Sequence, residues 1–257
     1  MTLTIGIPFF GDRAMLRQCV TSLRAQTFRD LRILVIGDGQ KPGLRTTDSR
    51  VQVYTLPTNK GAYFARAVAL AATETLWHGV VDADDWVEPE WAETLLAASA
   101  DAVQHGCRFV EERGQPGYVK PWRSARRRPT PHLVHYTSHT GIYGTERLRA
   151  AGGYSPAFRI GYDSFLSAIL RLLGPVEIVD RPLYHRRIHP DSLCQAASTR
   201  IRVGPERLRV RAMLDSAYAN AFRLRDHPHL VRRVVDRLTP PALWDEVHEH
   251  AEKVRRG

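Results

Sequence analysis

The sequence predicts an α/β fold, with a mostly parallel central sheet flanked by helices and a helical segment at its C-terminal end. In the first hundred residues, short apolar runs alternate with segments of helical spacing, as in parallel sheets with helices on both faces. The chain has 257 residues, of which 43% are hydrophobic and 25% charged, so it can bury a sizeable core and is neither disordered nor fibrous. Beyond residue 201 the pattern is helical and rich in arginine.

Four strands are predicted in the first hundred residues, each an apolar run that ends at a turn: 3–8, 31–36, 51–56 and 77–81. Helices are predicted where apolar residues recur at helical spacing, over 15–23 and over the Ala-rich 62–72. Three strands lead directly into polar or glycine-containing turns at 8–12, 37–39 and 82–85. Because ligands bind beyond the carboxyl ends of parallel strands, we expect these turns to meet at one crevice.

The following segments are less regular. A strand is predicted over 102–111, and a loop over 113–131, which holds six Lys and Arg residues besides several Gly and Pro. Further on, the pattern predicts a strand over 140–143, helices over 146–151 and 162–173, and short strands over 176–179 and 183–188. Helices beyond residue 201 are interrupted at His227-Pro228 and Pro240-Pro241.

The net charge of +10 is unevenly distributed. Residues 1–100 carry 10 Lys and Arg against 11 Asp and Glu, whereas residues 101–257 carry 27 against 16. Such an excess indicates either an anionic partner or a solvated basic surface. Neither a membrane span nor a signal segment is apparent, so we expect a cytoplasmic protein. The three cysteines lack metal-site spacing and are expected to be buried apolar side chains.

Asp82-Ala83-Asp84-Asp85 carries the clearest chemical signal. Three carboxylates in four residues repel one another unless a cation or hydrogen-bond donors compensate them. Carboxylate oxygens suit Mg²⁺ or Mn²⁺, which bind carboxylates together with substrate phosphates. The tetrapeptide therefore indicates a bridge between the protein and a nucleoside diphosphate. An acidic turn in which Asp85 caps the helix after Pro89 is the alternative, and spacing alone leaves both open.

Several ordered motifs support the first interpretation. They are Thr4–Phe10, Leu16–Phe28, Leu31–Gln40, Asn59-Lys60-Gly61 with Ala65-Arg66-Ala67, Asp82–Pro89 and, more loosely, Gly152-Gly153-Tyr154, Gly161–Leu166 and Leu183–Leu193. In this order they resemble the motifs of the inverting glycosyltransferases of family 2, which have the GT-A (Rossmann-like) fold. The chain departs from the family pattern at Phe10-Gly11, Gly37, Gln40 and Tyr162.

The resemblance implies a transfer of sugar from a nucleoside diphosphate sugar, with a UDP-sugar favoured, to an acceptor hydroxyl. It implies a single domain, in which 1–100 binds the nucleotide-sugar and 101–198 binds the acceptor, followed by a helical extension over 199–257. The nucleotide-sugar contacts that it implies are Pro8, Phe9, Asp38, Asn59, Gly61, Arg66, Asp82, Ala83, Asp84 and Arg186. Mn²⁺ or Mg²⁺ would bind at Asp84 and Asp82 with His189, while Asp85 orients the loop.

Inverting transfer needs one carboxylate to take the proton from the attacking hydroxyl. The resemblance assigns this role to Asp163, whose alternative role is to cap the helix that begins there. Arg187 is a second candidate for neutralising the leaving diphosphate. His139 and Trp122 are weaker candidates for contacts with the acceptor, which could be a saccharide, a lipid-linked glycan, a peptide or a natural product.

Two other functions fit parts of the sequence. A GT-A-like nucleotidyltransferase would share the fold, although residues 8–13 lack the glycine-rich phosphate loop expected of one. A nucleic-acid-binding module could use the arginines of 123–128, but this leaves Asp82–Asp85 unexplained. No nucleic-acid partner is therefore expected. The basic second half is compatible with peripheral contact at the inner face of a membrane, and the oligomeric state is left open.

Overall fold

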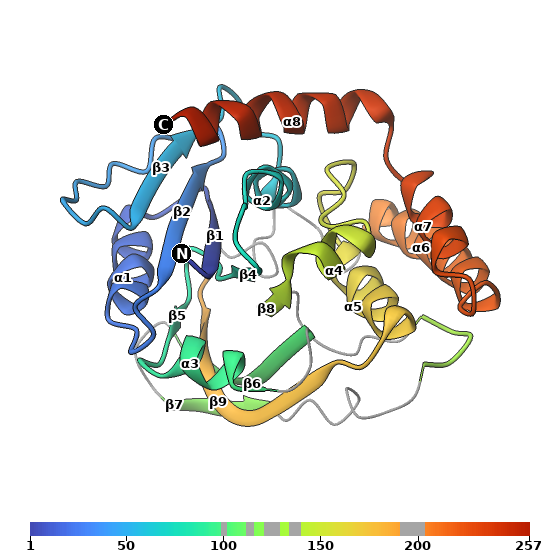
Figure 1. The fold of residues 1–257 in the computed structure, drawn as a ribbon, viewed down its shortest axis with the longest axis horizontal. Coiled ribbons are helices and arrows are strands. Elements are labelled where there is room, and N and C mark those ends of the chain that lie inside the picture. The colour runs from blue at the N-terminus through green and yellow to red at the C-terminus, as the bar shows by residue number, and fades with distance from the viewer. Residues whose placement is uncertain (99–101, 112–115, 121–128, 134–139, 191–203) are drawn as a thin grey trace.

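The computed structural model describes residues 1–98, 102–111, 116–120, 129–133, 140–190 and 204–257. Its first half is a parallel sheet built from β1 (Leu3–Phe9), β2 (Leu31–Gly37), β3 (Val51–Thr55) and β4 (Trp77–Val80), in the order β3-β2-β1-β4. The helices α1 (Arg13–Arg24) and α2 (Ala62–Ala71) connect these strands (Figure 1). The predicted elements of this half are confirmed to within a few residues at their ends.

The sheet continues as a mixed sheet in the second half. The strand β8 (Gly141–Gly144) pairs antiparallel with β4, and β6 (Ala102–Glu111) joins β8 to β9 (Glu177–Ile188). The short β5 (Trp86–Val87) pairs with β9, and β7 (Pro116–Lys120) pairs with β6. Around this part lie the helices α3 (Trp91–Leu96), α4 (Thr145–Ala150) and α5 (Tyr162–Leu173).

Two apolar cores cover opposite faces of the sheet. Alternate residues of β2 show this, because Ile33 packs with α1 and α3 on one side whereas Leu34 packs with α2, α5 and α8 on the other. The close approach of α2 requires a small residue on β1, since a Cβ at Gly6 would lie 2.9 Å from the Cβ of Ala69. The result is the layered α/β architecture that the sequence predicts.

Three helices end the chain: α6 (Pro205–Arg223), α7 (Pro228–Asp236) and α8 (Pro241–Arg256). Each begins with proline at its first position, where the missing N–H costs no helical hydrogen bond. The predicted interruptions at His227-Pro228 and Pro240-Pro241 are thus helix starts. In Figure 1, α8 (red) crosses α2 and ends beside β3. Within the described residues, no helix has the length and apolar character needed to cross a bilayer.

The structure differs from the predicted elements at three places. Residues 176–179 and 183–188 belong to the single strand β9, whose register against β6 shifts between His105 and Cys107. Pro182 lies in this irregularity and interrupts the apolar pattern. The short β5 was not predicted, and β7 lies inside the segment predicted as a loop, because such short strands are stabilised by pairing rather than by a local pattern. The helix after Pro89 is α3.

Candidate active site at the strand ends

The turns that follow β1, β2 and β4 lie together, as the predicted topology requires. The carbonyl of Phe9 accepts a 2.7 Å hydrogen bond from the N–H of Asp38. The side-chain amide of Gln40 pairs with the backbone of Gly11, accepting from its N–H at 2.8 Å and donating to its carbonyl at 3.0 Å. The buried thiol of Cys19 on α1 lies 3.5 Å from the carbonyl of Asp82. Hydrogen bonds therefore join the turns after β1 and β2 to each other, and Cys19 joins α1 to the turn after β4.

Gln40 and Gly11 are two of the departures from the family pattern, and they contact each other. A third departure, Gly37, has a steric cause: a Cβ at this position would lie 2.3 Å from the carbonyl oxygen of Gln40 and 2.9 Å from Pro42. No other residue fits where the chain folds back so closely. The three departures thus belong to one local rearrangement of the turn after β2.

Asp38 is buried, with 3% of its surface exposed. Its carboxylate accepts hydrogen bonds from the backbone N–H groups of Lys60 at 2.6 Å and Gly61 at 2.8 Å. Burial raises the pKa of Asp38 above its usual value, although these two hydrogen bonds oppose the shift. The carbonyl of Asp38 also accepts from the side-chain amide of Asn59 at 3.3 Å. Asp38 and the Asn59–Gly61 turn therefore form one hydrogen-bonded unit.

The two phenylalanines after Pro8 differ in their surroundings. Phe9, a nucleotide-sugar contact that the family resemblance implies, is 1% exposed, and its ring packs in the core with Ile5 and Ile7. Strand alternation could have revealed this, because Ile5, Ile7 and Phe9 share one face of β1. Phe10 is 66% exposed. The aromatic surface at this strand end is therefore Phe10, and Phe9 presents only its backbone.

Arg66 on α2 is buried, although arginines of helices are usually exposed to solvent. Its Nη2 lies 2.5 Å from Oδ1 of Asp82, and its guanidinium lies 5.2 Å from the centre of the Tyr63 ring. Arg66 is 6% exposed, so the pair is shielded from water and strengthened by the low local dielectric. The result is a fixed position for the first carboxylate of the acidic turn.

The carboxylates of Asp82, Asp84 and Asp85 have ligand atoms within 4.8 Å of one another. Asp85 is 2% exposed and accepts hydrogen bonds from the Tyr184 hydroxyl at 2.7 Å and the Arg187 N–H at 2.8 Å. Burial, together with the charges of Asp84 and Asp82, raises the pKa of Asp85 well above its usual value. Asp85 does not cap α3, whose N-cap is Glu90. Its contacts instead hold the acidic turn against β9.

Asp84 is the more open carboxylate, with 36% of its side chain exposed. The Nε2 of His189 lies 3.0 Å from its Oδ2, and Arg187 donates from Nε to the Asp84 carbonyl at 3.0 Å. Arg186 precedes Arg187 on β9, so its side chain points to the other face of the strand. Carboxylate oxygens with one imidazole nitrogen fit a divalent cation. The structure brings the carboxylates of Asp82 and Asp84 together and joins His189 to them through Asp84.

Asp163 lies in the first turn of α5 and is not the cap of that helix. The N-cap is Gly161, which has φ +76°. The hydroxyl of Tyr63 accepts a 3.1 Å hydrogen bond from the N–H of Asp163 and donates to its carboxylate at 3.4 Å. Tyr162, which replaces the usual acidic residue, stacks with Phe158 in the core at 5.0 Å between ring centres. Asp163 is thus linked through Tyr63 to α2, one turn from Arg66.

Sequence reasoning missed Arg159, which lies between α4 and α5. Its Nη1 is 3.4 Å from the side-chain oxygen of Asn59, and its Nη2 is 3.4 Å from the Asn59 carbonyl. Arg159 is exposed, and no motif marked it, because only the fold brings it to the Asn59 turn. It adds a cation beside Asp38. His139 and Trp122 lie outside the described residues.

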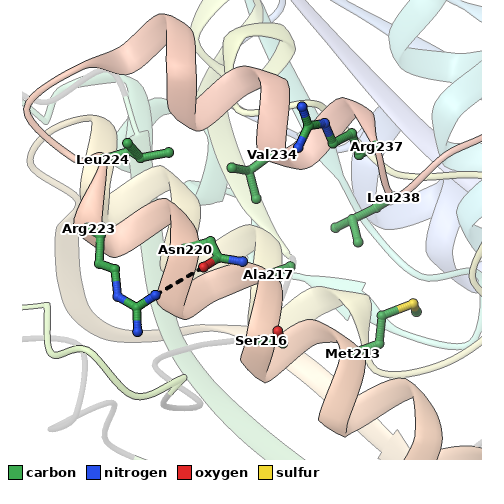
Figure 2. A pocket seen from close by; sticks show the side chains of 9 residues that line it. All are labelled: Met213, Ser216, Ala217, Asn220, Arg223, Leu224, Val234, Arg237 and Leu238. Carbon is green, nitrogen blue, oxygen red and sulfur yellow. Dashed lines mark hydrogen bonds between the residues drawn. The ribbon is translucent and has the colours of Figure 1, made fainter.

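A pocket of about 560 Å³ lies elsewhere, between α6 and the end of α7 (Figure 2). Arg223 donates from Nη1 to the side-chain oxygen of Asn220 at 3.3 Å across its rim. The pocket is lined by Met213, Ser216, Ala217, Asn220, Arg223, Leu224, Val234, Arg237 and Leu238. None of these residues comes from the strand ends, so the pocket is separate from the candidate site.

The family model described as glycosyl transferase family 2 matches residues 4–161. EpsH of Bacillus subtilis (strain 168) is 24% identical over 216 residues, which are 75% of this chain and 62% of that protein. A chondroitin synthase of Pasteurella multocida (strain Pm70) is 23% identical over 207 residues, which are 74% of this chain and 21% of that protein. The chain thus spans less than two thirds of the length of either relative.

Solved structures of S. aureus TarS have a similar fold. The structure of TarS 1–349 matches 98% of this chain and 92% of its own, with a TM-score of 0.60 and 16% identity. The structure of the same protein in complex with UDP-GlcNAc matches with a TM-score of 0.59. At this level of identity the likeness shows the fold, which includes both the parallel first half and the mixed second half of the sheet.

Proposed function

Because this chain belongs to glycosyl transferase family 2, we propose that it is a glycosyltransferase that moves a sugar, with inversion, from a UDP-sugar to an acceptor hydroxyl. One observation carries the proposal: Tyr63 and Arg66 on α2 connect the two carboxylates that such a reaction needs. Tyr63 contacts Asp163, and Arg66 contacts Asp82. The carboxylate suited to taking a proton therefore lies close to the acidic turn suited to a diphosphate.

The nucleoside would lie at the ends of β1 and β2. Asp38 faces this region together with the Asn59–Gly61 turn, and the exposed ring of Phe10 offers an aromatic surface for a base. Pro8 and the backbone of Phe9 shape the floor. Arg159 supplies a positive charge beside the turn. UDP is favoured because the similar TarS structures include complexes with UDP and UDP-GlcNAc.

The diphosphate would lie over the acidic turn. Asp82 and Asp84, with His189, would hold Mn²⁺ or Mg²⁺, and such a cation neutralises phosphate charge when it is bound. Ala83 brings the backbone of the turn close to the ligand. Arg187 lies at the same turn and is therefore favoured over Arg186, which points to the other face of β9, for neutralising the departing diphosphate.

Asp163 is the proposed general base. Its carboxylate takes the proton of the acceptor hydroxyl while the acceptor oxygen forms a bond to the anomeric carbon. The bond between that carbon and the diphosphate oxygen breaks on the opposite face, and the nucleoside diphosphate leaves with the electron pair. Tyr63 holds the carboxylate in place by its two contacts with Asp163. The anomeric configuration is inverted because attack and departure occur on opposite faces.

A donor panel tests this proposal. The protein is incubated with UDP-, GDP- and dTDP-sugars, with Mn²⁺ or with EDTA, and the release of nucleoside diphosphate is measured. We expect UDP to be released from a UDP-sugar with Mn²⁺ and not with EDTA. Asp84→Asn should abolish this release, whereas Asp245→Asn, a change at an exposed residue of α8, should leave it unaltered. The proposal fails if no nucleotide is turned over or if Asp84→Asn retains full activity.

Asp163 is tested separately. Asp163→Asn should keep the affinity for UDP with Mn²⁺, measured by calorimetry, while transfer to an acceptor falls by about 10²–10⁴-fold. Retained transfer would show that another group is the base. If the protein instead forms a sugar nucleotide from a sugar phosphate and does not consume the sugar nucleotide, the nucleotidyltransferase alternative is supported.

A further inference from the structure

The last helix of the chain packs against the proposed donor side. Val247, Ala251 and Val254 of α8 are buried in the same core as α2. Val254 accepts a 2.6 Å hydrogen bond from the side-chain amide of Gln52 on β3, and the ring of His250 lies 2.8 Å from the Tyr54 hydroxyl through Nδ1. The region that the family model matches ends at residue 161. These contacts therefore come from a segment that the family motifs do not include.

One contact from α8 reaches the turn before α2. The ammonium of Lys60 lies 2.9 Å from Oε1 and 3.2 Å from Oε2 of Glu246. The same ammonium lies 5.8 Å from the centre of the Phe64 ring. The side chains of Lys60 and Glu246 are 36% and 32% exposed, so this ion pair is half-buried between α8 and α2. Glu246 thus holds a residue of the Asn59–Gly61 turn.

That turn supplies both backbone N–H groups that hold Asp38. Lys60 donates to one carboxylate oxygen at 2.6 Å and Gly61 to the other at 2.8 Å. The fit is tight, because a Cβ at Gly39 would lie 2.4 Å from the backbone nitrogen of Asn59. Gly61 has φ +97°, a conformation that glycine adopts readily. A shift of the turn would therefore move the Asp38 carboxylate as well.

We propose that Glu246 is a positioning residue for donor binding. By pairing with Lys60, it fixes the Asn59–Gly61 turn, and the turn sets the orientation of Asp38 toward the nucleotide. The inference rests on the proposed function, in which Asp38 faces the nucleoside. Glu246 itself touches no reacting group, so it acts only through Lys60.

A direct role for Lys60 makes the opposite prediction. If the Lys60 ammonium bound the diphosphate, Glu246 would compete with the ligand for it, and removing the charge of Glu246 would strengthen binding. If Glu246 positions the turn, removing the same charge weakens binding. The sign of the change therefore separates the two roles.

The test compares four variants with the wild type: Glu246→Gln, Lys60→Met, the double variant, and Glu249→Gln. Glu249 is a matched control, since it is exposed on α8 and forms its ion pair with Lys253 of the same helix. Affinity for UDP in Mn²⁺ is measured by calorimetry. We expect Glu246→Gln and Lys60→Met each to weaken the affinity for UDP about three- to fivefold. The double variant should bind UDP no more weakly than either single variant.

A second measurement needs no nucleotide. Hydrogen exchange at residues 57–61 of the ligand-free protein reports whether the N–H groups of Lys60 and Gly61 stay bound to Asp38. Glu246→Gln should speed this exchange, and Glu249→Gln should not. Unchanged exchange at residues 57–61 in Glu246→Gln, or tighter UDP binding, would overturn the inference. If the wild type itself fails to bind UDP, the proposed donor is wrong, and the exchange comparison still decides the role of Glu246.

Discussion

Arg66 and Asp82 form a charged hydrogen bond of 2.5 Å between α2 and the acidic turn, with only 7% of the arginine side chain exposed. Removing one partner of a buried pair leaves the other uncompensated. Arg66→Met should therefore lower the free energy of unfolding by about 3 kcal/mol and abolish UDP binding. The stability and the UDP affinity of Arg66→Lys should lie between those of Arg66→Met and the wild type. Urea unfolding and calorimetry are the measurements, with Arg17→Met on the exposed face of α1 as the control. Wild-type stability in Arg66→Met would contradict the structure.

The hydroxyl of Tyr63 is predicted to matter for the transfer step rather than for donor binding. Tyr63→Phe keeps the ring in the core but removes both hydrogen bonds to Asp163. We expect kcat to fall about tenfold while the KM for the donor stays the same. Tyr154→Phe is the control, because the hydroxyl of Tyr154 is buried and has no hydrogen-bond partner within the described structure. An equal loss in both variants would rule out a specific role for Tyr63.

His78 is predicted to make stability depend on pH. Burial, and secondarily the charge of Arg149, lowers the pKa of His78 to about 3. The unfolded chain binds a proton near pH 6.5, whereas the native state binds it only near pH 3. The contribution of neutral His78 to the free energy of unfolding is therefore fully present above pH 6.5. It is lost as the pH falls toward 3, by about 1.4 kcal/mol for each pH unit.

The variant His78→Gln should remove this part of the slope. Urea unfolding between pH 4.5 and 7.5 measures how the free energy of unfolding changes with pH. This slope is compared between the proteins, and not the stability at one pH, because the variant also changes the packing. His248→Gln on the exposed side of α8 should keep the wild-type slope. Identical slopes for His78→Gln and the wild type would show that the pKa of His78 is the same in the native and unfolded states.

Gly37 is predicted to accept no larger residue. In Gly37→Ala the new methyl group would lie 2.3 Å from the Gln40 carbonyl, so the turn after β2 must shift. We expect a loss of about 2 kcal/mol in the free energy of unfolding and weaker nucleotide binding. Gly79→Ala on β4 is the matched control, because its nearest contacts are 3.4 Å away. A stable Gly37→Ala with wild-type affinity would mean that the turn is not rigid.

Local patterns were sufficient to predict the first half of the fold. Each βα unit there carries its own signal. In the second half the same holds for α5, which spans the predicted residues 162–173. The rest of the second half depends on distant pairing instead: β6 lies beside β9, which begins at Glu177, and the short β5 exists through its pairing with β9. No local pattern reveals such partners.

The same division applies to the site. The carboxylates of Asp82–Asp85 were found because they are close together in the chain. The partner of Asp85, in contrast, is Tyr184, which is 99 residues away. Without that partner, a capping role for Asp85 was a reasonable alternative. Arg159 and Glu246 carry no motif and are brought to the Asn59 turn by the fold. The roles of the site residues, the bound metal, the cytoplasmic location and the acceptor contacts at His139 and Trp122 stay predictions.

The packing of α8 has a consequence for the order of folding. Gln52 and Val254 are 202 positions apart, and Lys60 and Glu246 are 186 positions apart. Contacts this distant close large loops and form late, because the loop entropy is lost before the contact is gained. The turn that holds Asp38 is synthesised before α8, yet it is expected to reach its native form only after α8 has docked.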